Sequence, residues 1–278
     1  MTQTTTIQAL IDNYDALLLD AYGVLVTAGG SLPGAAAVVQ NLASRGRPYF
    51  VVTNDASRLP GAIAARLQGL GLPIEAERVV SSGALLTPYF REHGLAGCHT
   101  AVFGPADSQT YVRDAGGVVV EPGEAFDVLA VCDEHDTPFL EGANEALSSA
   151  YAQLERGATP RLVLPNPDLI APHGHGRFGF TAGALALLIE HGLALRYPER
   201  DDLRFDALGK PQTPLFDEAI RRAGSRNVVM IGDQLATDIA GANAAGIDSA
   251  LITGGVATAS IPAGGPQPTW LLPPLGDA

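Results

Sequence analysis

The sequence is poor in lysine, cysteine and long apolar runs. It has one lysine against sixteen arginines and only two cysteines, Cys98 and Cys132. Two cysteines do not form the disulfide framework of a small secreted domain, so we expect both to be buried free thiols. No apolar run approaches the roughly 18 residues of a membrane-spanning helix. Residues 1–6 lack the basic and hydrophobic regions of a signal peptide, and we expect a cytoplasmic protein.

Positive charge is scarce as well. The chain has 17 Lys and Arg residues against 30 Asp and Glu residues, which gives a formal net charge of -13. Such a surface repels nucleic-acid phosphates and acidic lipids, so we expect neither nucleic acid nor a membrane as partner. The oligomeric state is left open, homo-oligomers included.

What the sequence does contain is a set of short apolar runs that end in polar residues. The runs are residues 16–19, 49–52 and 228–231. They are typical of central strands in a parallel sheet, buried on both faces. Asp20 follows the first run, Thr53 and Asn54 the second, and Asp233 comes after the third. Ligands bind outside the carboxyl ends of such strands, so we predict that these side chains share one edge of the sheet.

An alanine-rich segment with helical spacing follows Asp233 and ends at Gly246, which suits a helix C-cap. Asp233 and Asp238 flank the start of this predicted helix. One interpretation is structural: a capping carboxylate or a carboxylate in the first turn stabilises a helix by about 0.5 to 2 kcal/mol. Metal binding is the other interpretation, and the two roles are compatible.

Lys210, the single lysine, lies in a predicted loop before a helical pattern at residues 215–220. A chain this rich in arginine would also use arginine at a merely solvated or salt-bridging position. Lys210 therefore indicates a need for a compact ammonium that approaches a phosphoryl oxygen and a carboxylate together, where a planar guanidinium is bulkier. The alternative is a surface lysine retained by chance.

Four separated motifs resemble those of a known family. The chain is similar to the haloacid dehalogenase superfamily and, within it, to the magnesium-dependent phosphatases of class IIA, such as sugar phosphatases and 4-nitrophenylphosphatases. The motifs are Asp20–Val24, Val52–Asn54, Gly209–Pro211 and Gly232–Ile239. Two further segments, Leu164–Asp168 and Phe180–Leu185, resemble the return from cap to core. The resemblance extends from about residue 12 to about residue 256.

The resemblance implies an α/β fold with a doubly wound parallel-sheet, Rossmann-like core and a smaller α/β cap domain inserted in it. We expect the core at residues 1–82 and 182–278 and the cap at residues 83–181, where it would act as a hinged lid that sets substrate specificity. The Pro- and Gly-rich tail after Gly254 is expected on the surface. Within the cap, we predict strands at residues 100–103, 117–120, 128–131 and 161–164, and helices at 108–114 and 141–156.

The resemblance also implies a covalent mechanism on a small phosphorylated molecule. Asp20 would attack phosphorus and carry the phosphoryl group, which divides one displacement into two easier steps. Thr53 and the amide of Asn54 would hold the phosphoryl oxygens. Lys210 would offset negative charge on Asp20 and on the substrate.

Mg²⁺ is the cofactor that the resemblance implies. Asp20, the backbone carbonyl of Tyr22 and Asp233 would supply oxygen ligands, and Asp238 would order a coordinated water. Without a cation, these carboxylates would repel an anionic substrate.

Tyr22 departs from the family pattern, which usually has a second Asp there to protonate the leaving group. A phenol with an unperturbed pKa of about 10 is poorly suited to accept a proton at neutral pH. General acid catalysis contributes about 10²- to 10⁴-fold, so either the substrate has a good leaving group or another residue supplies the acid. In the expected cap, His135, Asp168 and His173 are unranked candidates.

Two other functions were weighed. A 2-haloacid dehalogenase-type hydrolase would share the Asp-Ala-Tyr-Gly motif, but metal-free Asp233 and Asp238 would repel a halocarboxylate. Residues 26–52 also have room for a turn and one helix only, not for the helical cap of those enzymes. The second alternative is a catalytically impaired, phosphatase-like binding or regulatory protein that lost its acid at Tyr22.

Overall fold

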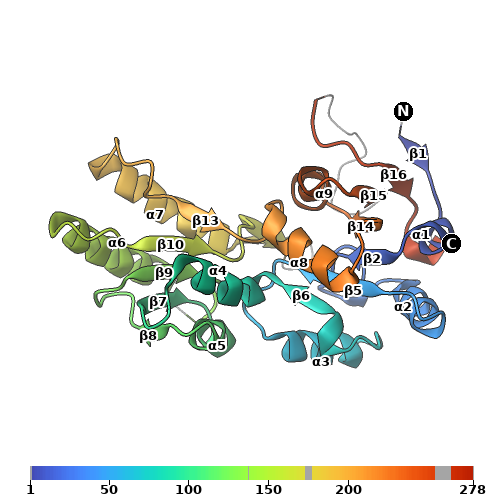
Figure 1. The fold of residues 1–278 in the computed structure, drawn as a ribbon, viewed down its shortest axis with the longest axis horizontal. Helices are drawn as coiled ribbons and strands as arrows, with labels where there is room; N and C mark the ends of the chain where they lie inside the picture. The colour runs from blue at the N-terminus through green and yellow to red at the C-terminus, as the bar shows by residue number, and fades with distance from the viewer. Residues whose placement is uncertain (1, 137, 173–176, 254–263, 278) are drawn as a thin grey trace. The chain divides into compact units, whose positions relative to one another are not determined.

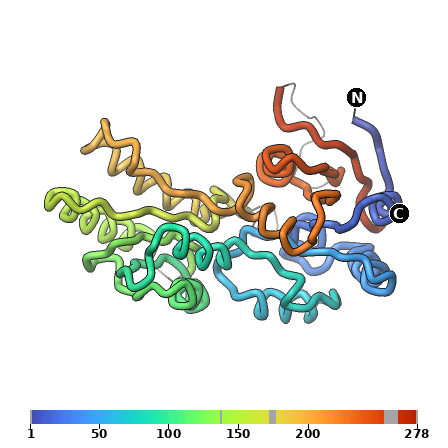
Figure 2. The backbone as a smooth tube through the Cα atoms, in the orientation of Figure 1, coloured from blue at the N-terminus to red at the C-terminus, as the bar shows by residue number. Residues whose placement is uncertain are grey.

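The computed structural model describes residues 2–136, 138–172, 177–253 and 264–277. These residues form two compact units. Unit 1 comprises the described residues within 1–53, 60–80 and 210–278, and unit 2 those within 54–59 and 81–209. The beginning and the end of the chain, blue and red in Figure 2, therefore belong to the same unit. Unit 2 is an insertion into unit 1.

Unit 1 contains a seven-stranded sheet in the described part of the chain (Figure 1). Every residue of the central strands β14 (Val228–Gly232), β2 (Ala16–Leu19) and β5 (Tyr49–Thr53) is buried, as the apolar runs predicted. Five pairs of neighbouring strands in this sheet are parallel: β1 with β16, β16 with β15, β15 with β14, β14 with β2, and β2 with β5. In spatial order the strands are β1 (Gln3–Thr4), β16 (Trp270–Leu272), β15 (Asp248–Ile252), β14 (Val228–Gly232), β2 (Ala16–Leu19), β5 (Tyr49–Thr53) and β6 (Val79–Ser81).

Helices cover both faces of this sheet because successive residues of a strand point to opposite sides. Leu17 and Leu19 of β2 belong to the core formed with α1, α2 and α3, whereas the buried Leu18 faces the other way. On the second face, α8 contacts β5, and α9 contacts β15 and α8. The helices are α1 (Ile7–Asn13), α2 (Ala35–Ser44), α3 (Pro60–Gly69), α8 (Thr213–Ala223) and α9 (Ala240–Ala245); a short hairpin joins β3 (Val26–Thr27) to β4 (Gly30–Ser31).

The predicted helix after Asp233 exists, but its first turn is irregular. Leu235–Ile239 is a π-helical turn, and the α-helical part, α9, begins only at Ala240. Gly246 ends the helix with φ +67°, the left-handed conformation that glycine adopts easily. Short π-helical turns occur frequently at functional sites, and this one carries Asp238.

Unit 2 contains a five-stranded parallel sheet of its own (Figure 1). Four of its strands match the predicted ones within one residue at each end, and the fifth, at Phe205–Ala207, was not predicted. The strands in spatial order are β13 (Phe205–Ala207), β10 (Arg161–Leu164), β9 (Val128–Val131), β7 (His99–Phe103) and β8 (Val118–Val120). The helices are α4 (Leu86–His93), α5 (Ala106–Asp114), α6 (Phe139–Glu155) and α7 (Ala182–Arg196), and β11 (Ile170–Pro172) pairs with β12 (Phe178–Phe180) in a hairpin.

The expected boundary between core and cap at residues 181 and 182 differs from the division in the structure. Helix α7 and strand β13 belong to unit 2, which continues to Gly209. The reason is burial: Leu185 and Ile189 of α7 pack in one core cluster with Leu129 of β9. The short segment 54–59 also belongs to unit 2, although the expected core included it.

Two smaller expectations need correction. Residues 254–263 of the tail lie outside the described residues, and the part at 264–277 is not wholly on the surface, because β16 joins the sheet of unit 1 and Leu272 is almost fully buried. Cys98 and Cys132 are both free, but only Cys132 is buried and Cys98 is partly exposed. No helix of the described residues is both long and apolar enough to cross a membrane.

Candidate active site

Asp20 lies immediately after β2 in unit 1, and its side chain is paired with the only lysine of the chain. Lys210 Nζ donates to Asp20 Oδ1 at 2.7 Å, to Asp238 Oδ1 at 2.7 Å and to the backbone carbonyl of Val52 at 3.2 Å. Asp20 and Lys210 are 6% and 3% exposed, so this is a buried ion pair and not a surface salt bridge. The hypothesis that Lys210 is a chance surface lysine is wrong.

Three carboxylates meet at this point. Asp20, Asp233 and Asp238 are buried, and one carboxylate oxygen of each lies within 4.8 Å of the other two. They come from the ends of β2 and β14 and from the π-helical turn after β14. Asp238 Oδ2 also accepts a hydrogen bond from the backbone N–H of Gln234 at 3.2 Å, so Asp238 both stabilises the turn and faces Lys210.

Two glycines allow the carboxylates to approach the backbone this closely. A Cβ atom at Gly23 would lie 2.2 Å from the carboxyl group of Asp233, and Gly23 has φ +83°. At Gly232, a Cβ atom would lie 2.3 Å from Asp238. Real Cβ contacts are never so short, so glycine is required at both positions.

Burial and charge act on this cluster together. Burial raises the pKa of the Asp20 carboxyl to about 8; the ammonium of Lys210 opposes the rise, and the carboxylate of Asp238 adds to it. Burial alone would lower the pKa of Lys210, but the carboxylates of Asp20 and Asp238 outweigh it and hold this pKa above its ordinary value. One ammonium does not balance three buried carboxylates.

The donor set fits a hard divalent cation. Mg²⁺ and Ca²⁺ prefer oxygen ligands, and a buried group of carboxylates in excess over ammonium groups is the environment that such ions stabilise. No imidazole or thiol belongs to the cluster of Asp20, Asp233 and Asp238, so the set does not suit a metal that prefers nitrogen or sulfur.

Thr53 and Asn54 follow each other in the chain but belong to different units. Thr53 ends β5 in unit 1 and is buried. Asn54 belongs to unit 2, where its Nδ2 donates to Asp168 Oδ1 at 2.9 Å. The hydroxyl of Ser82 donates to the backbone carbonyl of Asn54 at 2.9 Å.

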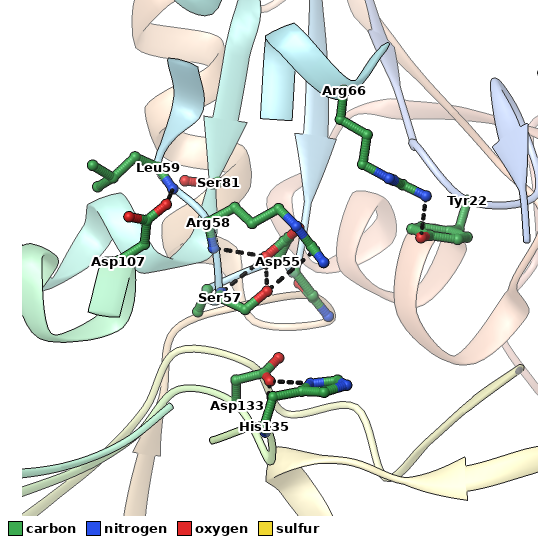
Figure 3. A network of polar contacts seen from close by, with 12 residues as sticks. Tyr22, Asp55, Ser57, Arg58, Leu59, Arg66, Ser81, Asp107, Asp133 and His135 are labelled. Carbon is green, nitrogen blue, oxygen red and sulfur yellow. Dashed lines mark hydrogen bonds and ion pairs between the residues drawn. The ribbon is translucent and has the colours of Figure 1, made fainter. Parts of the chain in front are cut away.

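Tyr22 is held by an arginine of α3. Arg66 Nη2 donates to the Tyr22 hydroxyl at 2.7 Å, and the guanidinium carbon lies 5.2 Å from the centre of the phenol ring (Figure 3). Tyr22 is 37% exposed, in contrast to the buried Asp20. No pattern in the sequence indicates this contact, because an isolated arginine on a helix is ordinary.

The three candidate acids differ in their surroundings. His135 Nδ1 lies 2.5 Å from Asp133 Oδ1 (Figure 3), and this hydrogen bond raises the pKa of His135. Asp168 accepts the hydrogen bond from Asn54 described above. His173 lies outside the described residues. Asp133 belongs to a polar run after a strand at residues 133–136, and its place two residues before His135 is visible in the sequence.

Comparison with known proteins places the chain in a family. Residues 17–118 match the family model for haloacid dehalogenase-like hydrolases, and residues 207–278 match a second model described as HAD-hydrolase-like. A glycerol-3-phosphate phosphatase from Gallus gallus is 30% identical over 269 residues, which is 91% of this chain and 84% of the relative. The protein belongs to the haloacid dehalogenase-like hydrolases.

Solved structures agree with the fold. A possible sugar phosphatase of this superfamily from Cytophaga hutchinsonii has a TM-score of 0.84 and 28% identity, with 98% of both chains covered. A glycerol phosphate phosphatase from Mycobacterium tuberculosis, solved in complex with magnesium, has a TM-score of 0.80 and 25% identity, with 99% of this chain and 78% of that chain covered.

Proposed function

We propose that the protein is a Mg²⁺-dependent phosphomonoester hydrolase that acts on a small phosphorylated polyol or sugar through a phosphoaspartyl intermediate. The observation that carries this proposal is the buried cluster in unit 1, in which Lys210 bridges Asp20 and Asp238 at 2.7 Å each. The substrate class rests on the relatives, which are named as phosphatases of glycerol phosphate and of sugars.

Asp20 is the nucleophile in this proposal. Its carboxylate oxygen attacks phosphorus, the bond from phosphorus to the leaving-group oxygen breaks, and water then hydrolyses the acyl phosphate and regenerates Asp20. The hydrogen bond from Lys210 fixes Oδ1, which orients the carboxylate. Lys210 also offsets the negative charge that gathers when a phosphate dianion approaches a carboxylate. Thr53 and the backbone amide of Asn54 are proposed to hold the phosphoryl oxygens.

Asp20, Asp233 and the backbone carbonyl of Tyr22 would hold the cation, with Asp238 orienting a water molecule on it. Bound there, Mg²⁺ would neutralise charge between the carboxylates and the phosphoryl group and polarise the phosphoryl oxygens. The magnesium complex of the Mycobacterium tuberculosis relative supports the choice of ion. The same carboxylates make metal-free dehalogenation the weaker alternative, because they would repel a halocarboxylate.

The position of Tyr22 limits the leaving groups that we expect. A phenol that accepts a hydrogen bond from Arg66 replaces the carboxyl group that usually acts as acid and base. We therefore propose that alkyl phosphates, sugar and polyol phosphates included, are hydrolysed more slowly than aryl phosphates, whose leaving group needs little protonation. Tyr22→Asp should raise turnover of an alkyl phosphate by about 10²-fold relative to 4-nitrophenyl phosphate. An unchanged ratio between the two substrates would contradict this account of Tyr22.

The experiment that tests the proposed function is hydrolysis of 4-nitrophenyl phosphate and glycerol 3-phosphate with Mg²⁺, with EDTA and by Asp20→Asn. We expect turnover that EDTA abolishes and that Asp20→Asn lowers by roughly 10⁴-fold or more, because a covalent nucleophile is removed. Asp12→Asn is the control, since Asp12 makes exposed contacts, a salt bridge with Arg45 and a hydrogen bond from Gln8. No turnover of either ester would reject the proposal and leave a binding or regulatory role, or dehalogenation, to be tested by halide release.

A further inference from the structure

The segment that follows Thr53 is bonded along its length to unit 2. Residues 54–59 belong to that unit, and side chains from other parts of it bond to the backbone of the segment at four points. These bonds are Ser82 Oγ to the Asn54 carbonyl at 2.9 Å, Ser108 Oγ to the Ala56 carbonyl at 2.8 Å, the Tyr111 hydroxyl to the Arg58 carbonyl at 2.7 Å, and the Leu59 N–H to Asp107 Oδ2 at 2.9 Å, the last drawn in Figure 3.

The side chain of Asn54 is held in one orientation. Its Nδ2 donates to Asp168 Oδ1 at 2.9 Å, and an ionised carboxylate only accepts hydrogen bonds, so this end of the amide must be the NH₂ group. The other end, Oδ1, faces Gly209, where a Cβ atom would lie 2.6 Å from it. Asp168 and the bare backbone of Gly209 therefore fix both ends of the amide.

The backbone of Asp168 is held by residues that come before and after it in the sequence. Its N–H donates to Asn166 Oδ1 at 3.1 Å, and its carbonyl accepts hydrogen bonds from the Gly183 N–H at 3.0 Å and from the Thr181 hydroxyl. Asn166 and Thr181 are buried. These contacts join the two segments that resembled the return from cap to core, and they hold the backbone of Asp168, from which the carboxylate reaches Asn54.

We propose that Asp168 is a positioning residue, which holds the Asn54 side chain so that the backbone of residues 53 and 54 is fixed for binding a phosphoryl group. The inference rests on the proposed function, in which Thr53 and the Asn54 amide bind the phosphoryl oxygens. It assigns one of the three candidate acids to a different role. The role needs a hydrogen-bond acceptor at residue 168 and no transferable proton.

Two substitutions at residue 168 separate the positioning role from an acid role. Asp168→Asn keeps an acceptor oxygen but cannot release a proton, whereas Asp168→Leu keeps the approximate size and removes the acceptor. We expect Asp168→Leu to lower kcat/KM for 4-nitrophenyl phosphate by about 10²-fold, the effect of a misplaced binding group. Inhibition by orthophosphate should weaken with it. Asp168→Asn should stay close to the wild type in both measurements.

Asp206→Leu is the matched control for stability. Asp206 is another unit 2 carboxylate with side-chain partners, since it accepts from Arg161 Nη1 at 2.9 Å and from the Tyr89 hydroxyl. The Asp206→Leu substitution should lower Tm without changing kcat/KM or the inhibition constant of orthophosphate. Asn54→Leu and the double variant Asn54→Leu with Asp168→Leu complete a cycle, and we expect the double variant to lose no more activity than either single one.

Three outcomes would overturn the inference. Unchanged orthophosphate inhibition in Asp168→Leu would show that Asp168 does not support phosphoryl binding. Fully additive losses of activity in the double variant would show that Asp168 does not act through Asn54. A selective loss of alkyl phosphate turnover in Asp168→Asn would identify Asp168 as the acid instead. These results require an active wild type and so leave the proposed function intact, whereas a wild type without turnover would overturn both.

Discussion

Each unit of the described chain brings together three side chains of the kind that bind metals, and the two groups differ in burial. Asp20, Asp233 and Asp238 in unit 1 are all buried, and Lys210 lies against two of them. In unit 2, residues 133–135 form the second group, in which only Asp133 is buried and the His135 side chain is 60% exposed. Metal-ligating residue types that lie close together are therefore not enough to indicate a metal site, and burial distinguishes the two groups.

The two groups also differ in how they arise. Residues 133–135 are consecutive, so a single turn after β9 brings them together whatever the rest of the chain does. Asp20 and Asp233 are more than 200 residues apart and meet only because β2 and β14 are neighbours in a parallel sheet. Folding therefore brings the unit 1 carboxylates together against their mutual repulsion, a cost that the proposed metal site would explain.

The largest effect should follow from removing the ammonium of the buried cluster. Lys210→Met leaves buried carboxylates without their partner and should lower the free energy of unfolding by about 3 to 5 kcal/mol, measured by urea denaturation. Arg200→Met is the surface counterpart. Its pair with Asp202 has side chains that are 38% and 56% exposed, so Arg200→Met should lower the free energy of unfolding far less than Lys210→Met. Equal losses in the two variants would remove the distinction drawn between buried and exposed charge.

A metal titration should separate the two clusters next. Adding Mg²⁺ at about 100 times its Kd to EDTA-treated protein should stabilise it by about 2.7 kcal/mol, seen as a rise in Tm. Asp233→Asn should abolish this rise, and Asp133→Asn should leave it unchanged. The reverse pattern would place the metal at residues 133–135 and contradict the assignment.

The smallest effect should come from His135 in the exposed cluster. Its pKa is raised in the folded state by the hydrogen bond to Asp133, so the pair stabilises the fold fully below the unfolded-state pKa of about 6.5. This contribution is lost as the pH rises through the folded-state pKa. The Tm difference between wild type and His135→Gln should therefore be larger at acidic than at alkaline pH. A pH-independent difference would show that charge does not stabilise this pair.

Much of the fold and part of the site could be predicted from local patterns. The apolar runs before Asp20 and Asp233 are strands because side chains buried on both faces leave a short, continuous hydrophobic signal. Four of the five strands in the unit 2 sheet carried a similar apolar signal, and β13 was not predicted. Local patterns failed at the unit boundary, because α7 is apolar on most sides and nothing in its sequence says which sheet it covers.

Contacts between distant residues account for the rest. The bond from Asn54 to Asp168 joins positions 114 apart, and the sequence singled out both residues without linking them. Arg66 and Tyr22 lie 44 positions apart, and no sequence pattern indicates that they form a hydrogen bond. Such pairs depend on the register and packing of whole elements, which no local pattern encodes.

The sequence by itself determined the α/β class and the strands that precede Asp20 and Asp233, and it singled out Lys210, because burial and charge leave marks in local composition. Only the tertiary structure decided that these groups share one buried cluster, that Asp168 holds Asn54, and that β16 completes the sheet of unit 1. The physical reason is that side-chain hydrogen bonds and strand pairing act over distances of a few ångströms in space, regardless of separation along the chain.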